Sequence, residues 1–169
     1  MSKGKIVGIS EGRACTSCLE LSQKKIHQYQ NPTGLSKTAP GIVTDKDGIA
    51  SSVLLNGGYS DDEDYLNRII YTGSGGQDEN KRIQIADQVT EGKAGRNNLG
   101  LINAYLNESP LRVIRGFKHK SKYSPKRGYR YDGIHFIKRY WWTESIHGPL
   151  VIRFELIHED KYSGRVEII

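Results

Sequence analysis

Long apolar runs are missing from this sequence. No stretch approaches the roughly 20 apolar residues that a membrane-crossing helix requires. The basic start, Met1 to Lys5, is followed by no continuous apolar segment, so it lacks the pattern of a signal peptide. We therefore expect a protein that stays inside the cell and has no membrane partner.

Cysteine is scarce as well, which excludes a fold held together by disulfides. The two cysteines form a single C-x-x-C, Cys15 and Cys18, which fits half of a zinc site, a redox pair or two ordinary thiols. A structural zinc site needs four ligands, and the five histidines contain no closely spaced pair to complete one. We favour ordinary reduced thiols and expect neither a metal nor a cofactor.

Acidic residues are almost absent from one part of the chain. The span from Arg112 to Arg139 holds ten Lys and Arg against a single acid, Asp132, so it carries +9 while the whole chain carries +6. Three tyrosines are interleaved with these cations and Tyr140 follows them directly; the three are Tyr123, Tyr129 and Tyr131. Such a segment suits a polyanion with stackable bases, because Lys and Arg displace the counterions of phosphates. A solvated basic loop is the alternative interpretation.

The 169 residues contain 36% hydrophobic and 26% charged residues, with 19 glycines, which is typical of one globular domain rich in turns. Alternating apolar residues predict a strand over 150–157, and shorter signals predict strands over 52–55, 68–72, 111–115, 134–142 and 165–169. Helices are expected over about 17–28, capped by Thr16 or Ser17, and around 99–106. The predicted class is α+β, a single domain with a curved, barrel-like sheet flanked by a few helices.

Three segments stand out from this background: 57–64 (GGYSDDED), 71–78 (YTGSGGQD) and 128–133 (GYRYDG). Taken singly, each has a generic explanation, because glycine-rich stretches are usually turns and acidic runs are usually solvated. The order of the three segments and their residues together resemble the SRA domain. This domain is also named YDG, after the tripeptide found here at 131–133. The resemblance covers about residues 40–157 and extends through Gly41-Ile42, Asp87-Gln88, 112–115 (RVIR), Ser124-Pro125 and Tyr140-Trp141.

What the resemblance implies is a PUA-like SRA fold over 40–169, with residues 1–39 as an N-terminal segment of the same domain. It implies a non-catalytic reader of double-stranded DNA that flips 5-methylcytosine into a pocket. Tyr59 and Tyr71 would stack on the base, and Asp62 would accept a hydrogen bond from its N4 amino group. Thr72 and Ser74 would line the pocket, and Gly57, Gly58 and Gly73 would let the backbone approach the base.

In the family, loops inserted through the grooves of the duplex fill the gap that the extruded base leaves. The segment Asn80-Lys81-Arg82 resembles the inserted finger, and a second inserted loop would lie near Lys37, Thr38 and Ala39. Basic residues of the span from Arg112 to Arg139 are expected to contact phosphates. They are Arg112, Arg115, Lys118, Lys120, Lys122, Lys126, Arg127 and Arg130.

Several alternatives stay open. The runner-up interpretation is the recognition module of a modification-dependent restriction system, fused to or partnered by an HNH-type nuclease. The preferred mark is either 5-methylcytosine or 5-hydroxymethylcytosine. A minor alternative is a metal-dependent nuclease that uses the acidic cluster, Glu79 and Lys81. Compact loops favour a bacterial source, so we expect a cytoplasmic, nucleoid-associated protein, or a nuclear one if the source is eukaryotic.

Overall fold

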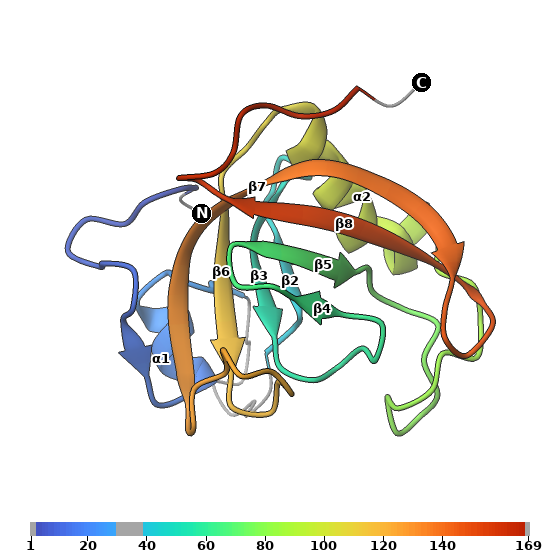
Figure 1. The fold of residues 1–169 in the computed structure, drawn as a ribbon, viewed down its shortest axis with the longest axis horizontal. Coiled ribbons are helices and arrows are strands. Elements are labelled where there is room, and N and C mark those ends of the chain that lie inside the picture. The colour runs from blue at the N-terminus through green and yellow to red at the C-terminus, as the bar shows by residue number, and fades with distance from the viewer. Residues whose placement is uncertain (1–2, 30–38, 168–169) are drawn as a thin grey trace.

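A strongly curved mixed sheet forms the centre of the molecule (Figure 1). The computed structural model describes residues 3–29 and 39–167. Within them the sheet has eight strands in the order β2-β3-β6-β7-β8-β5-β4, with β1 beside β7. The strands are β1 (Ala14–Cys15), β2 (Ile42–Thr44), β3 (Ala50–Leu55), β4 (Glu63–Asp64), β5 (Arg68–Thr72), β6 (Leu111–Gly116), β7 (Tyr129–Glu144) and β8 (Leu150–His158), and the helices are α1 (Cys18–Gln23) and α2 (Gly92–Leu106).

The long strand β7 joins the two parts of the sheet. Its first half pairs with β6 and its second half with β8, both antiparallel, while β3 and β6 run parallel. The register shifts between Arg112 and Ile114 in β6 and between Ile137 and Arg139 in β7. Such bulges bend a strand and increase its twist. The sheet therefore curls into the barrel-like shape of Figure 1 instead of lying flat.

Two apolar clusters fill this shape. The larger one lies between α2 and the sheet and contains Leu101, Tyr105, Phe154 and Tyr71, all nearly inaccessible to solvent. The smaller one joins the N-terminal residues Cys15, Cys18, Leu21 and Ile26 to Leu54, Ile114, Tyr129 and Tyr131 of the sheet. Cys15 and Cys18 are free thiols, and the Cys18 sulfur lies 3.1 Å from the Tyr129 hydroxyl. The N-terminal segment thus packs on the sheet.

The predicted α+β class with a curved, barrel-like sheet is confirmed. Strand β5 has the predicted bounds, and β3, β6, β7 and β8 extend those predicted. Helix α1 begins at the predicted cap, where the Ser17 side chain accepts from the Glu20 N–H at 3.1 Å. It ends well before residue 28, because Lys25 takes a left-handed conformation (φ 62°). No helix in the described ranges is both long and apolar enough to span a membrane.

The strand predicted over 165–169 is wrong for its described residues, 165–167. The segment closes the end of α2 instead. The Arg165 side chain donates to the carbonyl oxygens of Tyr105 and Leu106, and its backbone N–H donates to Glu108. Only Val166 bonds to the sheet, through Lys138 of β7. Residue types do alternate in this segment, but apart from that one bond its backbone and side-chain groups bind the C-terminal end of α2 instead of a neighbouring strand.

Candidate nucleic-acid interface

Three loops lie at the lower end of the molecule in Figure 1. Residues 56–62 connect β3 to β4, residues 73–91 connect β5 to α2, and residues 117–128 connect β6 to β7. All three carry segments that the sequence singled out. The fold therefore brings together residues that are about 60 positions apart in the chain.

Tyr59, Asp62 and Tyr71 converge at this end. The half-buried Tyr59 accepts the Gly75 N–H at 2.7 Å through its hydroxyl oxygen. Tyr71 is 3% exposed, and its hydroxyl donates to the Gly41 carbonyl at 3.0 Å. Burial raises the pKa of both phenols, and the nearby carboxylate of Asp62 raises both further. The two rings make no direct ring contact in the described structure. Two aromatic side chains therefore lie near one carboxylate, and their rings are not packed against each other.

One oxygen of Asp62 is already fixed. Its Oδ1 accepts the backbone N–H of Thr72 at 2.7 Å. Burial raises the pKa of this carboxyl to about 7, although the Thr72 bond and the charges of His119 and Arg153 lower it. The buried Thr72 hydroxyl lies near the same carboxyl and lowers its pKa further. Asp62 therefore keeps one acceptor oxygen for a polar ligand.

Two of the predicted pocket glycines have a packing role. A Cβ at Gly57 would lie 2.5 Å from the Lys118 carbonyl oxygen, and one at Gly73 would lie 2.5 Å from Ile152 and 2.6 Å from Asn98. These two residues permit close packing of the chain against itself, and the expected approach of their backbone to a base stays a prediction. Gly58 faces open space.

Side-chain amides that the sequence reasoning gave no role hold the loop after β5. Asn98 of α2 accepts the Ser74 N–H at 2.7 Å and donates to the Ser74 carbonyl at 2.9 Å. Gln88 donates to the Gly73 carbonyl at 2.6 Å, and Gln84 donates to the Gly75 carbonyl at 2.7 Å. All three amides are buried. The one available signal was a polar residue, Asn98, on the apolar stripe of the helix, because such a residue needs a buried partner.

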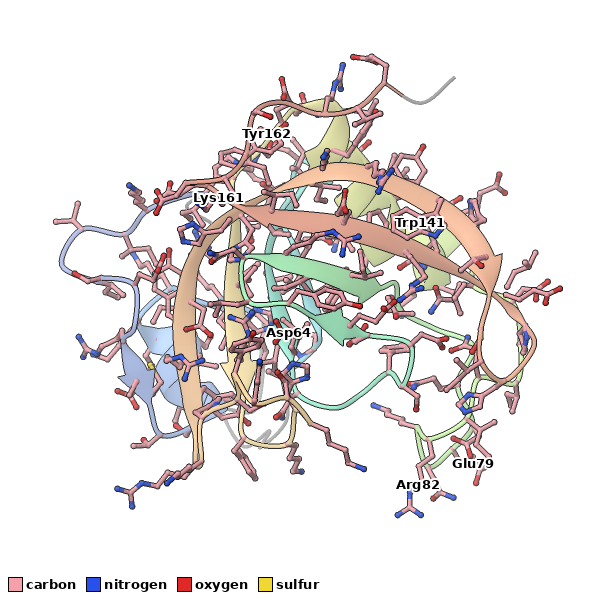
Figure 2. All side chains as sticks on the ribbon, in the orientation of Figure 1. Asp64, Glu79, Arg82, Trp141, Lys161 and Tyr162 are labelled. Carbon is pink, nitrogen blue, oxygen red and sulfur yellow. The ribbon has the colours of Figure 1, made fainter. Side chains whose placement is uncertain are left out.

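The predicted finger projects from the body. Figure 2 shows Arg82 and Glu79 at the lower tip of the loop after β5, away from the sheet. Asp78 shapes the turn, because its side chain accepts the Arg82 N–H at 2.8 Å and its carbonyl accepts the Lys81 N–H at 3.0 Å. Asn80, Lys81 and Arg82 are all exposed. The finger is thus a preformed turn with free cations at its tip.

The basic residues divide into two groups. Five of the predicted phosphate contacts are exposed in the loop from 117 to 128, namely Lys118, Lys120, Lys122, Lys126 and Arg127. Arg130 is held by Asp132 at 2.5 Å and by the Tyr123 carbonyl, and its side chain is 31% exposed. Arg112 and Arg115 are only 1% exposed. The expectation that these two contact phosphates is therefore wrong, because no polyanion can reach them.

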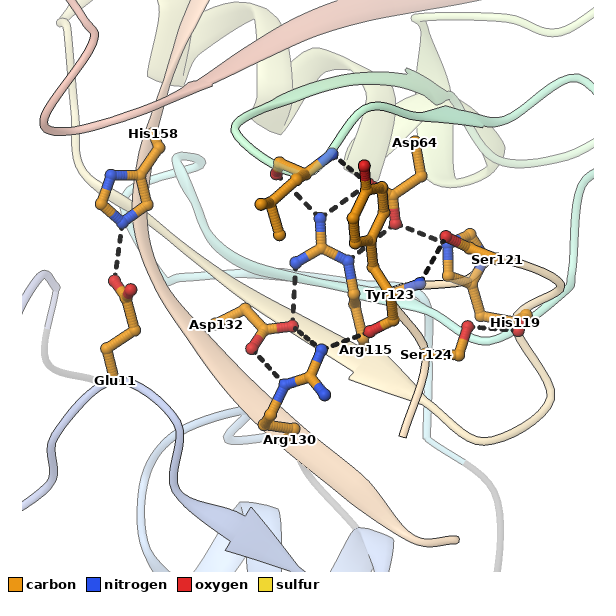
Figure 3. A network of polar contacts seen from close by, with 11 residues as sticks. Glu11, Asp64, Arg115, His119, Ser121, Tyr123, Ser124, Arg130, Asp132 and His158 are labelled. Atoms are coloured by element: carbon orange, nitrogen blue, oxygen red, sulfur yellow. Dashed lines mark hydrogen bonds and ion pairs between the residues drawn. The ribbon is translucent and has the colours of Figure 1, made fainter. Parts of the chain in front are cut away.

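Buried acceptors explain the two arginines. Arg112 donates to the carbonyl oxygens of Ile26 and Gly4 at 2.8 and 2.9 Å. Arg115 of β6 makes two 2.7 Å bonds to Asp64 of β4 and one of 2.8 Å to Asp132 of β7 (Figure 3). Bonds from Arg115 and His119 hold the pKa of Asp64 well below its usual range, although burial alone would raise it. Arg115 thus joins three strands.

The YDG tripeptide belongs to the same network. Tyr131 is buried in the smaller cluster, and Asp132 bridges Arg115 and Arg130. Gly133 has φ 89°, and a Cβ there would lie 1.8 Å from the Glu11 carboxylate. The motif that carried the resemblance most visibly is therefore structural in this molecule.

The acidic cluster is divided among separate partners. Asp61 accepts from the Ser145 hydroxyl at 2.7 Å, Glu63 pairs with Arg153, and Asp64 pairs with Arg115. Within residues 3–29 and 39–167, no three His, Cys, Asp or Glu side chains form a group that could hold a metal. Of the second predicted loop, Lys37 and Thr38 lie outside the described residues, and Ala39 packs against the smaller cluster.

Comparisons with known proteins agree with this geometry. The model of the SAD/SRA domain matches residues 2–161. A UHRF1-like protein of Cryptococcus neoformans is 34% identical over 159 residues, which are 89% of this chain and 44% of that protein. The E3 ubiquitin-protein ligase UHRF1 of Bos taurus is 33% identical over 95% of this chain and 22% of its own length. The chain thus spans less than half the length of these curated relatives.

Solved structures show the same fold. The modification-dependent TagI restriction endonuclease superposes with a TM-score of 0.79 at 34% identity, over 92% of this chain and 51% of that one. The SRA domain of SUVH5 in a complex with methylated CHH DNA has a TM-score of 0.72 at 29% identity, over 99% of this chain and 100% of that one. The same SUVH5 domain has also been solved bound to fully hydroxymethylated CG DNA.

Proposed function

Because this chain belongs to the SAD/SRA domain family, we propose that it reads modified cytosine in duplex DNA by extruding the base into the space between Tyr59 and Tyr71. Asp62 accepts from the N4 amino group of the base. The exposed cations of the 117–128 loop bind phosphates, and the finger at 80–82 enters the duplex where the base has left.

The observation that supports this proposal most strongly is the convergence of Tyr59, Tyr71 and Asp62 beside an exposed basic loop. Stacking on an aromatic side chain contributes roughly 1–3 kcal/mol per base. Two such faces offset the few kcal/mol that extrusion of a base costs. The free acceptor of Asp62 then distinguishes cytosine, which offers an amino donor, from thymine, which offers a carbonyl oxygen.

A binding titration against matched duplexes tests the proposal. The duplexes differ at one position only, which holds cytosine, 5-methylcytosine or 5-hydroxymethylcytosine. One methyl group contributes about 0.8 kcal/mol, and a well-shaped pocket up to about 3, so we expect a preference over plain cytosine of roughly tenfold and below a few hundredfold. Equal affinity for all three duplexes would contradict a reader function.

Tyr59→Ala tests the stacking. Tyr59 is half-buried, whereas Tyr71 is part of the larger apolar cluster, so truncation of Tyr59 separates base binding from folding. We expect a loss of roughly 1–3 kcal/mol in binding to the 5-methylcytosine duplex. In the parent protein, 2-aminopurine beside the target cytosine should brighten as its neighbour unstacks. Tyr71→Phe, which keeps the ring, serves as the control, and undiminished fluorescence in Tyr59→Ala would contradict the clamp.

Neutralising Lys118, Lys120 and Lys122 to Gln tests the phosphate contacts. All three are exposed in the loop between β6 and β7. Each neutralised phosphate contributes about −0.9 to the slope of log K against log salt. We expect the triple variant to flatten that slope by about 2 to 3 and to weaken methylated and unmethylated duplexes alike. The slope is measured by titration at several salt concentrations, and an unchanged slope would exclude this loop from the interface.

A second candidate is the recognition module of a modification-dependent restriction system. The likeness to TagI favours it, since the match covers 51% of that endonuclease. The chain itself would then bind without cleaving. We expect modified plasmid to remain supercoiled when incubated with this chain and Mg²⁺ or Mn²⁺. Cleavage that Lys81→Ala abolishes would revive the metal-dependent nuclease alternative.

A further inference from the structure

A cationic trough lies on the surface of the sheet, beside β4, β5 and β7. Its first hollow, of about 460 Å³, is lined by residues of β4, β5 and β7 that include Arg68, Arg139 and Trp141. A second hollow of about 280 Å³ adjoins it and contains Lys138 and Lys161. Tyr65 and Arg68 line both hollows, so the two are neighbours, and together they are called the trough here.

Two arginines in this trough are paired with one buried carboxylate. Glu155 of β8 is 2% exposed. One of its oxygens accepts a hydrogen bond from the Nε of Arg68 at 2.6 Å, and the other forms an ion pair with the Nε of Arg139 at 3.1 Å without hydrogen-bond geometry. The two arginine side chains are nevertheless 46% and 48% exposed. Their terminal nitrogens have no hydrogen-bond partner in the described part of the chain, which leaves two guanidinium forks for an anion.

The charge of the trough is positive after its internal pairs are counted. Glu63 is paired with Arg153, which leaves Arg68, Arg139, Lys138 and Lys161 against the single carboxylate of Glu155. Glu63 is itself exposed and lines the first hollow, where its ion pair with Arg153 offsets its charge, and Asp160, next to Lys161, lies 3.7 Å from His158. Phosphates suit such forks, because the planar guanidinium group binds two oxygens at once.

Aromatic rings stand beside the cations. Tyr65 is 52% exposed and lies 5.3 Å from the Arg68 guanidinium, and Trp141 lies 5.7 Å from that of Arg139. Alternating cations and aromatic rings along a groove are typical of proteins that bind single-stranded nucleic acid. An extended peptide would instead need a free strand edge; β5, β7 and β8 are paired on both sides, and the edge strand β4 offers only two residues.

We propose that this trough is a second nucleic-acid site, which binds a short segment of single-stranded DNA with its phosphates on Arg68 and Arg139 and its bases on Tyr65 and Trp141. Figure 2 shows Trp141 and Lys161 on the upper part of the molecule, whereas Arg82 of the finger lies at the lower tip. The trough therefore lies away from the finger, and its lining includes none of Tyr59, Asp62 and Tyr71, so the proposal does not depend on the proposed function.

The test measures binding of a fluorescent oligothymidylate of about eight nucleotides. Thymine is chosen because the acceptor at Asp62 disfavours it in the modified-base site. We expect Trp141→Ala to weaken binding roughly tenfold. The neighbouring Trp142→Ala is the matched control, since Trp142 is 43% exposed but does not line the trough. A triple variant, Arg68→Gln, Arg139→Gln and Glu155→Gln, removes the forks without leaving the buried carboxylate unpaired.

Three outcomes would overturn the proposal. The first is equal loss in Trp141→Ala and Trp142→Ala. The second is loss in Tyr59→Ala with none in Trp141→Ala, which would place the strand in the modified-base site. The third is displacement of the oligothymidylate by polyglutamate at an equal concentration of charge, which would identify an acidic peptide surface. If the triple variant does not fold, Trp141→Ala and its control still decide, because neither residue belongs to an apolar cluster.

Discussion

Arg115→Gln is expected to lower the free energy of unfolding by about 3–5 kcal/mol, because it leaves buried carboxylates without their counterion. Arg115 forms two bonds to Asp64 and one to Asp132, and both the arginine and Asp64 are almost inaccessible to solvent. Gln is too short to reach both acids and carries no charge. Urea unfolding followed by circular dichroism measures the loss as a lower midpoint.

Arg127→Gln is the control for this experiment. Arg127 lies in the same basic segment but is exposed, so its loss should change stability by less than about 0.5 kcal/mol while weakening DNA binding. The two variants therefore separate the structural role of a buried arginine from the DNA-binding role expected of an exposed one in the same basic segment. A stable Arg115→Gln protein whose only defect is in DNA affinity would show that Arg115 contacts phosphate after all.

Asp62→Asn is expected to reduce binding to the 5-methylcytosine duplex by about 2–4 kcal/mol and to narrow the gap to a thymine mismatch. The reason lies in the fixed oxygen. Because Oδ1 accepts the Thr72 N–H, the Asn carbonyl oxygen must take that place, and the NH₂ group then faces the base. A donor would meet the N4 donor of cytosine, and a buried pair of unsatisfied donors costs about 1–3 kcal/mol per group. Thymine offers its O4 acceptor to the same NH₂ group.

The pH dependence of binding provides an independent check on Asp62. Its pKa is raised to about 7, so the carboxylate is the main form above that pH and the neutral acid below it. The acceptor for N4 is therefore present at high pH and is lost as the pH falls through about 7. We expect affinity to rise roughly tenfold between about pH 6 and pH 8, and Asp62→Asn to lack this rise. If Asp62→Asn binds as tightly as the parent, Asp62 does not contact the base edge.

Local patterns predicted most of the longer strands well, because the alternation of apolar and polar residues lies within each strand. The alternation over 150–157 marks β8, and it holds there because Ile152, Phe154 and Leu156 point into the larger cluster. The same pattern failed at 165–167, where the capping of α2 uses the backbone groups. Strand order was not predictable, since the parallel pair of β3 and β6 depends on contacts between residues about 60 positions apart.

The candidate site was predicted in its types of residue and less well in their roles. Tyr59, Asp62 and Tyr71 converge as expected from the resemblance. The prediction that Arg112 and Arg115 contact phosphates failed. It came from a count of charges, and such a count cannot show that these two side chains point inward to buried acceptors. The pattern of apolar and polar residues along β6 could not reveal this burial either, because all six residues of the strand are buried, on both faces of the sheet. The buried amides of Asn98, Gln84 and Gln88 were missed for a related reason, because their partners are backbone groups.

The contact between Gly57 and the backbone of Lys118 links two loops that are far apart in sequence. The Asn56 side chain also accepts the Lys118 N–H at 3.0 Å. The loop that carries Tyr59 and the basic loop at 117–128 are therefore held together at this point. Under the proposed function, the phosphates that the basic loop binds would set the position of Tyr59 along the duplex, so this one contact would fix which nucleotide the pocket receives.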